Sequence, residues 1–393
     1  MSQPPEAVSC SEAELQAEIV GSITAIDAAA WNACAGSGNP FVRHGFLAAL
    51  EQSRSAAGET GWLPRHAVLK DGNGEIVACA PLYVKSHSYG EYVFDWGWAE
   101  AYARAGGRYY PKLQCAIPFT PVTGPRLLSR HDSAAHRLAL SRTMVEFAGQ
   151  AKLSSVHLTF PTQAEADLLE GPDWLRRLGC QYHWDNEGYG CFDDFLGALA
   201  SRKRKQVRKE REAVAAQDLA ITTLVGDDVK AHHWDAFYRF YEATVDRKWG
   251  RAYLNREFFD HLAASEVAGS VVLVWVEKDA QPLAAAFNML GDDTLYGRTW
   301  GVAPGGDLPF LHFEACYYRA LDFAIAHNVA RVEAGAQGEH KVARGYLPTA
   351  THSLHWIADP ALRRAVDKFV AHERTLLAED MNEQAAAGPF RQC

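Results

Sequence analysis

The chain has 393 residues, of which 48% are hydrophobic and 22% charged, so it can bury the cores of two domains of ordinary size. No apolar run is long enough to cross a bilayer, and the polar, acidic N-terminus shows no signal peptide, so we expect a cytoplasmic protein. A net charge of −9 argues against a chain that binds nucleic acid over its whole surface, and the 8 cysteines include no Cys-x-x-Cys pair that would indicate a zinc cluster.

The first half of the chain begins with a predicted hairpin. Residues 66–83 contain two strand-like segments on either side of Asp71-Gly72-Asn73-Gly74, a sequence typical of a tight turn. The elements predicted to follow are a strand rich in aromatic residues, a helix and a further strand, at residues 92–98, 138–150 and 155–160.

A long insertion separates the aromatic strand from the helix. Residues 99–132 are aromatic, basic and rich in Pro and Gly, without helical periodicity. Such a segment inside a compact domain is usually functional or disordered, and its aromatic content argues against disorder. Lys112 could bind an anionic head group while Tyr110 lines an apolar channel. Plain packing of this loop on the first half is an equal alternative.

The junction of the two halves, residues 191–218, contains a predicted basic helix over 193–216. Seven of the eleven residues 201–211 are Lys or Arg, and helical spacing places Arg204 and Arg208 on one face. Arg side chains can hold a phosphate through two hydrogen bonds, and ligands often bind between domains. The pattern predicts either an anion-binding helix or a solvated helix between domains.

The second half repeats the order of the first. A hairpin, an aromatic strand, a helix and a strand are predicted at residues 272–288, 295–301, 313–326 and 331–335. In this alignment Val156 lies over Val332, so His157 is the counterpart of Glu333. We therefore predict an α/β fold of two related halves, at residues 20–190 and 219–360, followed by a C-terminal helix and tail at 361–393.

A polar, glycine-rich run at residues 333–346 is confined to the second half. Glycines bring the backbone close to a ligand on which charged groups can act. Glu333 and His340 are candidate bases, because the charged neighbours of His340 could move its pKa across neutrality. Candidate binding residues in this run are Gly335, Gln337, Lys341 and Arg344.

These segments resemble the Fem ligases, which are peptidoglycan-bridge aminoacyltransferases, and the wider FemAB-like N-acyltransferases of the GNAT superfamily. The resemblance covers residues 20–360. Arg204-Lys205-Gln206-Val207-Arg208-Lys209 matches the basic segment before the second domain of Fem chains, and residues 333–336 and 341–346 take the places of the motifs that end that domain. The chain has no room for the long helical hairpin that some Fem ligases use near transfer RNA. The insertion Gln337-Gly338-Glu339-His340 also departs from the ligase pattern. The resemblance therefore favours the FemAB-like branch, which looks like it includes the bacterial ceramide synthases.

The resemblance implies two tandem GNAT-like domains joined by the basic helix, with the acyl donor held where two neighbouring strands separate. In the second half these strands would be residues 294–302 and 331–335, which makes Arg298 and Trp300 candidate binding residues. The Gly-rich loop 303–309 would present backbone amides at a helix N-terminus, and His312 just beyond it is a third candidate base. The pyrophosphate signature of GNAT enzymes is not matched cleanly, so the basic helix is the alternative holder of the donor's phosphates. No metal ligand set is expected.

The activity implied by this resemblance is N-acyl transfer. Acyl-CoA or an acyl carrier protein would be the co-substrate, no cofactor would be bound permanently, and the acceptor would be an amine. A sphingoid base or another amino lipid is the specific expectation, which would allow peripheral contact with the inner membrane. Two alternatives stay open: a Fem-type transferase that uses aminoacyl-tRNA, with transfer RNA as its partner, and a non-catalytic binding module.

Overall fold

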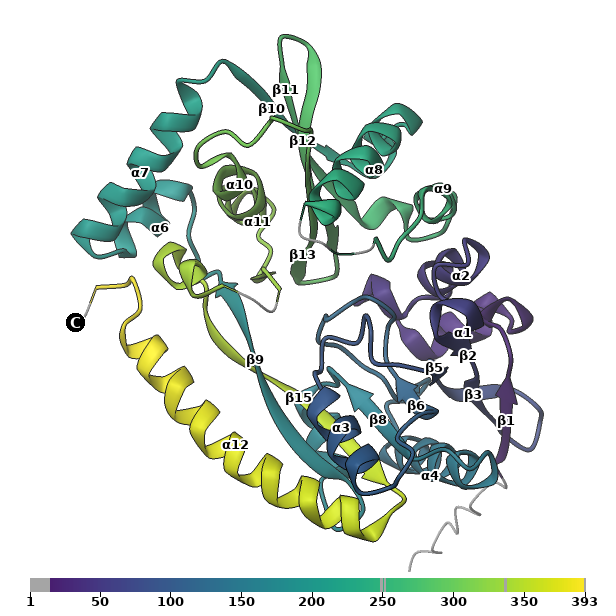
Figure 1. The fold of residues 1–393 in the computed structure, drawn as a ribbon. Helices are drawn as coiled ribbons and strands as arrows, with labels where there is room; N and C mark the ends of the chain where they lie inside the picture. Colours follow the sequence, from purple (N-terminus) through teal and green to yellow (C-terminus); the bar gives the residue numbers. More distant parts are fainter. Residues whose placement is uncertain (1–14, 248–249, 251, 336–337, 392–393) are drawn as a thin grey trace, which may run out of the picture.

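The computed structural model describes residues 15–247, 250, 252–335 and 338–391 (Figure 1). The strands of the first half are β1 (Gln16–Val20), β2 (Trp62–Pro64), β3 (His66–Lys70), β4 (Ile76–Ala80), β5 (Leu82–Lys85), β6 (Lys112–Cys115), β7 (Leu128–Ser129), β8 (Ser155–Thr159) and β9 (Leu175–Asp185). Its helices are α1 (Ala28–Ala35), α2 (His44–Gln52), α3 (Trp96–Arg104), α4 (Ala134–Gln150) and α5 (Gln163–Leu169).

Two short helices, α6 (Phe192–Ala198) and α7 (Ser201–Ala215), lead into the second half. The strands there are β10 (Leu219–Val225), β11 (Val271–Lys278), β12 (Gln281–Leu290), β13 (Thr294–Val302), β14 (Arg331–Glu333) and β15 (Leu347–Ile357). The helices are α8 (Ala231–Asp246), α9 (Arg256–Ala263), α10 (Leu311–Phe313), a π-helical turn (Glu314–Tyr318), α11 (Arg319–Ala326), a 3-10 helix η7 (Glu339–Arg344) and α12 (Pro360–Ala386).

The two halves have matching topology and exchange their last strands. Within the described residues, one large sheet has the order β10-β11-β12-β13-β14-β9-β15-β8-β6-β5-β2, and a smaller sheet has the order β1-β3-β4-β7. Strand β14 lies between β13, which is parallel to it, and β9, which is antiparallel. In the same way β8 lies between the parallel β6 and the antiparallel β15. Each half therefore completes its sheet with the final strand of the other half, and β9 and β15 pair at the centre (Figure 1).

The predicted repeat is confirmed at the level of individual residues. The hairpins β3–β4 and β11–β12 form as expected. His157 pairs with His355 across β8 and β15, and Glu333 pairs with His183 across β14 and β9. Because the topology places β8 and β14 at equivalent positions, His157 and Glu333 are counterparts in the structure as in the sequence.

The prediction of an aromatic strand at residues 92–98 is wrong. Residues from Trp96 onwards form helix α3, and the strand equivalent to β13 is β6, which lies inside the segment interpreted as an insertion. Trp98 and Tyr102, one helical turn apart, pack with residues of α12 such as Val366. This helical spacing outweighs the strand preference of aromatic side chains.

The basic segment is also different from the prediction, because it forms two helices and not one. Leu199 and Ala200 have extended backbone angles between α6 and α7. The backbone of Leu199 forms a bridge with Phe390, and the Ala200 N–H donates to the carbonyl of Pro389. Pairing with the C-terminal segment thus takes the backbone groups that a continuous helix would have used.

A buried cluster rich in aromatic residues joins the halves. Phe41 and Phe46 of the first half belong to it, together with Phe258 and Tyr296 of the second. The ring centroids of Phe41 and Tyr296 are 5.3 Å apart, and those of Phe46 and Phe258 are 5.8 Å apart. An apolar contact of this kind holds two domains in one arrangement, and the candidate site lies beside it.

Candidate active site

Strands β13 and β14 separate in the second half, where the sequence analysis expected an acyl donor. They pair only from Thr294 to Tyr296 and from Arg331 to Glu333, while β13 continues to Val302. A Cβ atom on Gly297 would lie 3.1 Å from the Glu333 carbonyl oxygen, so glycine allows the close approach of the backbones just before they part. The strand separation follows from the early end of β14.

A β-bulge directs two consecutive side chains of β13 to the same side. Phe287 pairs with Thr299 and Asn288 pairs with Gly297, which leaves Arg298 as an extra residue in β13. Bulges bend a strand and change the direction of its side chains. Arg298 and Thr299 consequently both line a pocket between the two halves.

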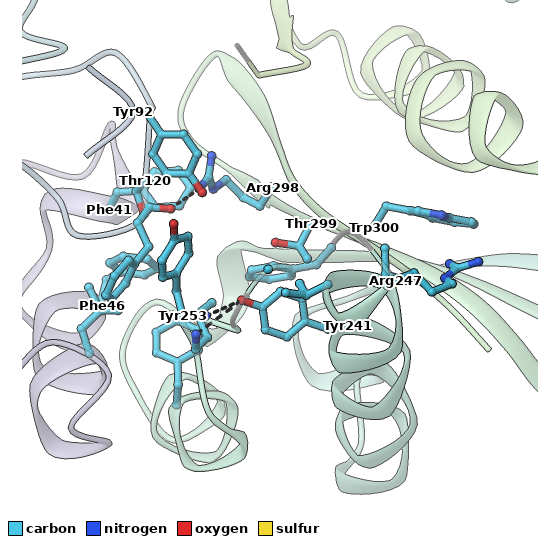
Figure 2. Close-up of a pocket in the computed structure, with 18 of the residues that line it drawn as sticks. Phe41, Phe46, Tyr92, Thr120, Tyr241, Arg247, Tyr253, Arg298, Thr299 and Trp300 are labelled. Carbon is cyan, nitrogen blue, oxygen red and sulfur yellow. Dashed lines mark hydrogen bonds between the residues drawn. The ribbon is translucent and has the colours of Figure 1, made fainter. Parts of the chain in front are cut away.

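This pocket has a volume of about 770 Å³ and an apolar body (Figure 2). The first half contributes Phe41, Phe46, Leu50, Tyr92, Phe119 and Thr120. The second half contributes Tyr241, Thr244, Val245, Arg247, Gly250, Tyr253, Leu254, Phe258, Phe287, Arg298, Thr299, Trp300, Asp307 and His312. The size is that of a small-molecule site, and the lining favours a ligand with a long apolar part.

Aromatic contacts hold the wall of the pocket in place. The rings of Phe119 and Tyr253 are stacked with their centroids 4.9 Å apart, which connects the halves directly. The Tyr241 hydroxyl accepts hydrogen bonds from the backbone N–H groups of Tyr253, at 2.9 Å, and Leu254, at 3.4 Å. The segment that carries Tyr253 is thus fixed to helix α8.

Glu333 is a buried acid at the point where the strands separate. It is 5% exposed, and its Oε1 lies 3.9 Å from Nε2 of His183. Its Oε2 and the Nδ1 of His183 have no hydrogen-bond partner among the described residues. Burial raises the pKa of Glu333 from its ordinary 4.5 to about 8, although the positive charges of Arg331, Arg298 and Arg126 oppose that shift. Burial also lowers the pKa of His183 to about 3, so this neighbour is neutral.

The carboxyl of Glu333 therefore titrates near physiological pH. A general base works best when its pKa is close to the working pH, and strongly shifted carboxyls are common at active sites. Glu333 is in register with Tyr296, whose ring contacts Phe41 in the cluster between the halves, so both side chains lie on the same side of the sheet. Glu333 itself does not line the pocket.

His312 and His340 lie on either side of one tyrosine. The His312 ring is 5.6 Å from Trp300 and 5.4 Å from Tyr317, and both His312 and Trp300 line the pocket. His340 is exposed, and its Nε2 lies 3.1 Å from the Tyr317 hydroxyl. Burial, then the charges of Arg344 and other neighbours, lower the pKa of His340. The structure thus places His312 at the pocket and His340 behind Tyr317.

Lys341 and Arg344 are buried and have partners within the protein. Lys341 Nζ donates to the carbonyls of Ala334, at 2.7 Å, and Gly335, at 3.0 Å. Gly335 has a φ of 80°, which favours glycine. Arg344 forms an ion pair with Glu210 of α7 at 2.8 Å. These contacts hold the segment after β14 in place, while Gln337 lies outside the described residues.

The cations of α7 do not reach the pocket. Arg208 contacts Asp193 at 3.5 Å, and both Arg208 and Arg204 belong to a helix on the far side of α10 and α11 from α8 (Figure 1). The structure therefore does not bring Arg204 and Arg208 together with Arg298, Trp300 and His312, which line the pocket.

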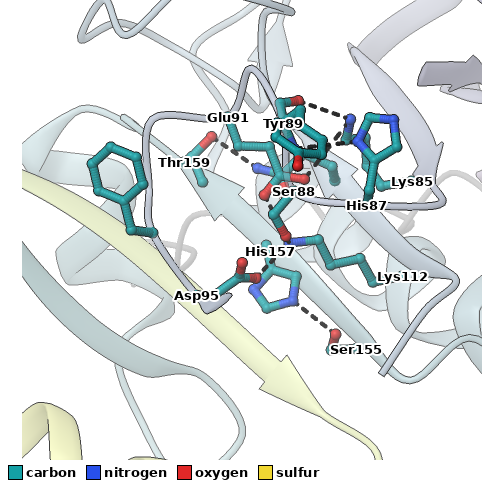
Figure 3. A network of polar contacts seen from close by, with 12 residues as sticks. Lys85, His87, Ser88, Tyr89, Glu91, Asp95, Lys112, Ser155, His157 and Thr159 are labelled. Atoms are coloured by element: carbon teal, nitrogen blue, oxygen red, sulfur yellow. Dashed lines mark hydrogen bonds and ion pairs between the residues drawn. The ribbon is translucent and has the colours of Figure 1, made fainter. Parts of the chain in front are cut away.

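Lys112 belongs to a separate buried network in the first half (Figure 3), and Tyr110 contacts this network through Ser88. Lys112 Nζ donates to Glu91 at 2.7 Å and also to Asp95. The Tyr110 hydroxyl is 2.7 Å from that of Ser88. These side chains line no part of the pocket between the halves.

In the first half, a pair of histidines takes the place of the cross-strand pair Glu333 and His183. The Nδ1 atoms of His157 and His355 are 2.6 Å apart, and His157 Nε2 is 2.7 Å from the Ser155 hydroxyl. Burial lowers the pKa of His157 to about 3. The two halves thus carry different chemistry at related positions: the pKa of Glu333 lies near neutrality, and that of its counterpart His157 does not.

Sequence reasoning missed the partner of Glu333 and most of the pocket. One signal was available: His183-Trp184 in β9 and His355-Trp356 in β15 repeat the same pair at equivalent positions. The aromatic lining carried no such signal, because distant segments contribute it. Among the described residues, no group of three or more His, Cys, Asp or Glu is arranged for a metal ion, and no helix is both long and apolar enough to span a membrane.

Comparison with known proteins gives a family and a fold. The model of the FemAB_like family, described as peptidoglycan biosynthesis/recognition, matches residues 22–392. No curated protein sequence matches the chain. The crystal structure of FemX is similar with a TM-score of 0.51 at 12% identity, covering 81% of this chain and 93% of that one.

Two further solved structures are similar over most of their length. L-PGS from Bacillus licheniformis has a TM-score of 0.51 at 8% identity, covering 85% of this chain and 97% of that one. The C-terminal domain of a putative lysylphosphatidylglycerol synthetase from Agrobacterium fabrum has a TM-score of 0.50 at 11% identity, covering 87% and 94%. These similarities and the repeated topology support the expected α/β fold of two related halves. The chain belongs to the FemAB-like family.

Proposed function

We propose that this chain joins a long-chain acyl group to a primary amine, with an acyl-CoA or acyl carrier protein thioester as the donor. The observation that carries the proposal is that Glu333, a buried carboxyl with a pKa of about 8, lies where β13 and β14 separate, while Arg298 and Thr299, further along β13, line an apolar pocket. A base and an apolar binding site at one strand end fit amide formation from a lipid-like substrate.

The reaction needs a neutral amine and a protonated leaving group. The carboxylate of Glu333 takes a proton from the substrate ammonium, the amine nitrogen attacks the thioester carbonyl, the N–C bond forms and the C–S bond breaks. The proton lost by the attacking nitrogen goes to the departing thiolate. His312, at the edge of the pocket, is the second candidate for handling a proton, and His340 with Tyr317 is the third.

The pocket supports an acceptor or acyl chain of considerable length. Its apolar wall includes Phe46, Tyr253 and Phe258, and each methylene buried there contributes about 0.8 kcal/mol to binding. An amino lipid is our proposal for the acceptor, and a sphingoid base is the first member of that class to test. The donor is a co-substrate, and the protein holds no cofactor of its own in this scheme.

An aminoacyl-tRNA-dependent transferase is the second candidate. The exposed cations of α7, including Arg202, Lys205 and Lys209, favour it, because an RNA partner needs a basic surface. The names of the similar structures point the same way: one is FemX and another is a putative lysylphosphatidylglycerol synthetase.

The test is an assay of the purified protein with palmitoyl-CoA and sphinganine. Free thiol is measured as it is released, and the amide product is identified by mass spectrometry. We expect amide formation that depends on the amine and falls roughly 10²- to 10⁴-fold in Glu333→Gln. Amide formed only when aminoacyl-tRNA replaces palmitoyl-CoA would favour the second candidate, and no product with either donor would contradict both.

A further inference from the structure

Arg298 is a cation in the pocket whose hydrogen-bonding capacity is mostly unused. Its Nη2 donates to the Phe119 carbonyl at 2.8 Å, and its guanidinium lies 5.7 Å from the Phe41 ring centroid. A guanidinium has five N–H donors. No carboxylate in the described part of the chain forms an ion pair with Arg298, so the remaining donors have no anionic partner from the protein.

The second cation of the pocket is in a different situation. Arg247 forms an ion pair with Asp307, and both residues line the pocket. Glu333 does not neutralise Arg298 either. The two side chains are not within ion-pair distance, and the raised pKa of Glu333 keeps most of that carboxyl protonated at pH 7. Arg298 is therefore the charge in this pocket that a ligand would have to balance.

Other polar groups gather around Arg298. Figure 2 shows Tyr92 and Thr120 close to Arg298, with Phe46 farther from it. Burial raises the pKa of Tyr92 to about 12, so its hydroxyl stays a hydrogen-bond donor at neutral pH. The surroundings of Arg298 are thus rich in hydrogen-bond donors, and apolar side chains such as Phe46 line the pocket nearby.

We propose that Arg298 binds an anionic group of the acceptor, a carboxylate or a phosphate, so that the preferred acceptor is an amphiphile with an acidic head beside its amine. This inference rests on the proposed function, because it concerns the same pocket, and it narrows the acceptor class. A sphingoid base offers hydroxyls at its head and leaves the guanidinium unbalanced. A long-chain amino acid or a phosphorylated amino lipid balances it, with the chain between Phe46 and Tyr253.

The position of Arg298 explains why an arginine serves here. The β-bulge turns its side chain into the pocket next to Thr299, and the rigid strand limits its movement. A planar guanidinium recognises carboxylate and phosphate through paired hydrogen bonds, which the ammonium of a lysine cannot reproduce.

Binding of simple amphiphiles tests this without any turnover. The probes are dodecanoate, dodecyl phosphate and dodecanol below their aggregation limits, and calorimetry gives each Kd for the wild-type protein, Arg298→Met, Arg298→Lys and Arg247→Met. We expect at least one anionic probe to bind roughly 10- to 100-fold more tightly than dodecanol. That preference should vanish in Arg298→Met, weaken in Arg298→Lys and persist in Arg247→Met, whose cation already has a partner.

The outcomes distinguish a carboxylate acceptor from a phosphate acceptor, and they distinguish failure of this inference from failure of the proposed acyl transfer. Preference for dodecanoate alone indicates a carboxylate acceptor, and preference for dodecyl phosphate alone indicates a phosphate. A merely structural Arg298 would weaken all three probes equally in Arg298→Met. Equal affinity of the wild-type protein for all three probes overturns the inference, and this comparison stands even if a variant fails to fold. A protein that prefers the anions but forms no amide would contradict the proposed function alone.

Discussion

Replacing Glu333 by glutamine should stabilise the protein at alkaline pH. The carboxyl holds its proton more tightly in the folded chain, with a pKa of about 8, than in the unfolded chain, where the ordinary value is 4.5. Its contribution to stability is therefore complete below pH 4.5 and is lost as the pH rises towards 8, because in this range the carboxyl ionises in the unfolded chain while the folded chain must keep it protonated. Glutamine resembles the protonated form and never ionises.

The size of the effect follows from the displacement of the pKa. A change from 4.5 to about 8 corresponds to at most about 5 kcal/mol. In a chain of 393 residues, 1 kcal/mol changes Tm by about 1 °C. We expect Glu333→Gln to melt within error of the wild type at pH 5 and up to about 5 °C above it at pH 9.

The assay is a series of thermal melts of both proteins between pH 5 and 9. Glu165→Gln is the matched control, because Glu165 is also buried but accepts hydrogen bonds from the backbone N–H groups of Arg126 and Leu127. That variant should lose stability and gain none at alkaline pH. A constant difference in Tm between Glu333→Gln and the wild type across the whole range would refute the reasoning about Glu333.

Three further experiments test the surroundings of the site. Arg344→Met removes the cation that pairs with buried Glu210, so it should lower the free energy of unfolding by about 3–5 kcal/mol and Tm by several degrees. Adding Glu210→Gln should restore part of this loss. An unchanged melt would show that the pair is dispensable. Arg204→Glu with Arg208→Glu tests whether α7, which does not reach the pocket, holds the phosphates of the acyl donor outside it. KM for the donor should then rise more than kcat falls, and an unaltered KM would leave α7 a solvated helix. His340→Ala should reduce kcat with little change in Tm if His340 transfers a proton, because its side chain is exposed; full activity would leave proton transfer to other groups.

Much of the fold could be predicted because local patterns and tertiary structure agree. The hairpins over 66–83 and 272–288 carry turn residues between strand-like segments, and both form. Strand β6 could not be found this way. Its four residues, Lys112 to Cys115, show little alternation of polar and apolar side chains. Lys112 can be buried because it pairs with groups such as Glu91, and these partners come together only in the folded chain.

Sequence analysis could not predict that β9 and β15 each pair with a strand of the other half. The pattern of side chains in each strand fits a neighbour from either half. The run at 333–346 identified Glu333, and the raised pKa of that carboxyl arises from burial that the folded chain creates. Lys341 and Arg344 looked like ligand-binding cations in the sequence. In the structure they pair with carbonyls and with Glu210, because buried charges need partners within the protein.

The central claim is that acyl transfer takes place in the second half, where β13 and β14 separate. A crystal structure with a non-hydrolysable thioether analogue of palmitoyl-CoA tests it most directly. The account predicts the sulfur between Gly297 and the end of β14, close to Glu333, with an apolar chain in the pocket beside Trp300. An analogue bound in the first half instead, between β6 and β8 next to His157, would contradict the account.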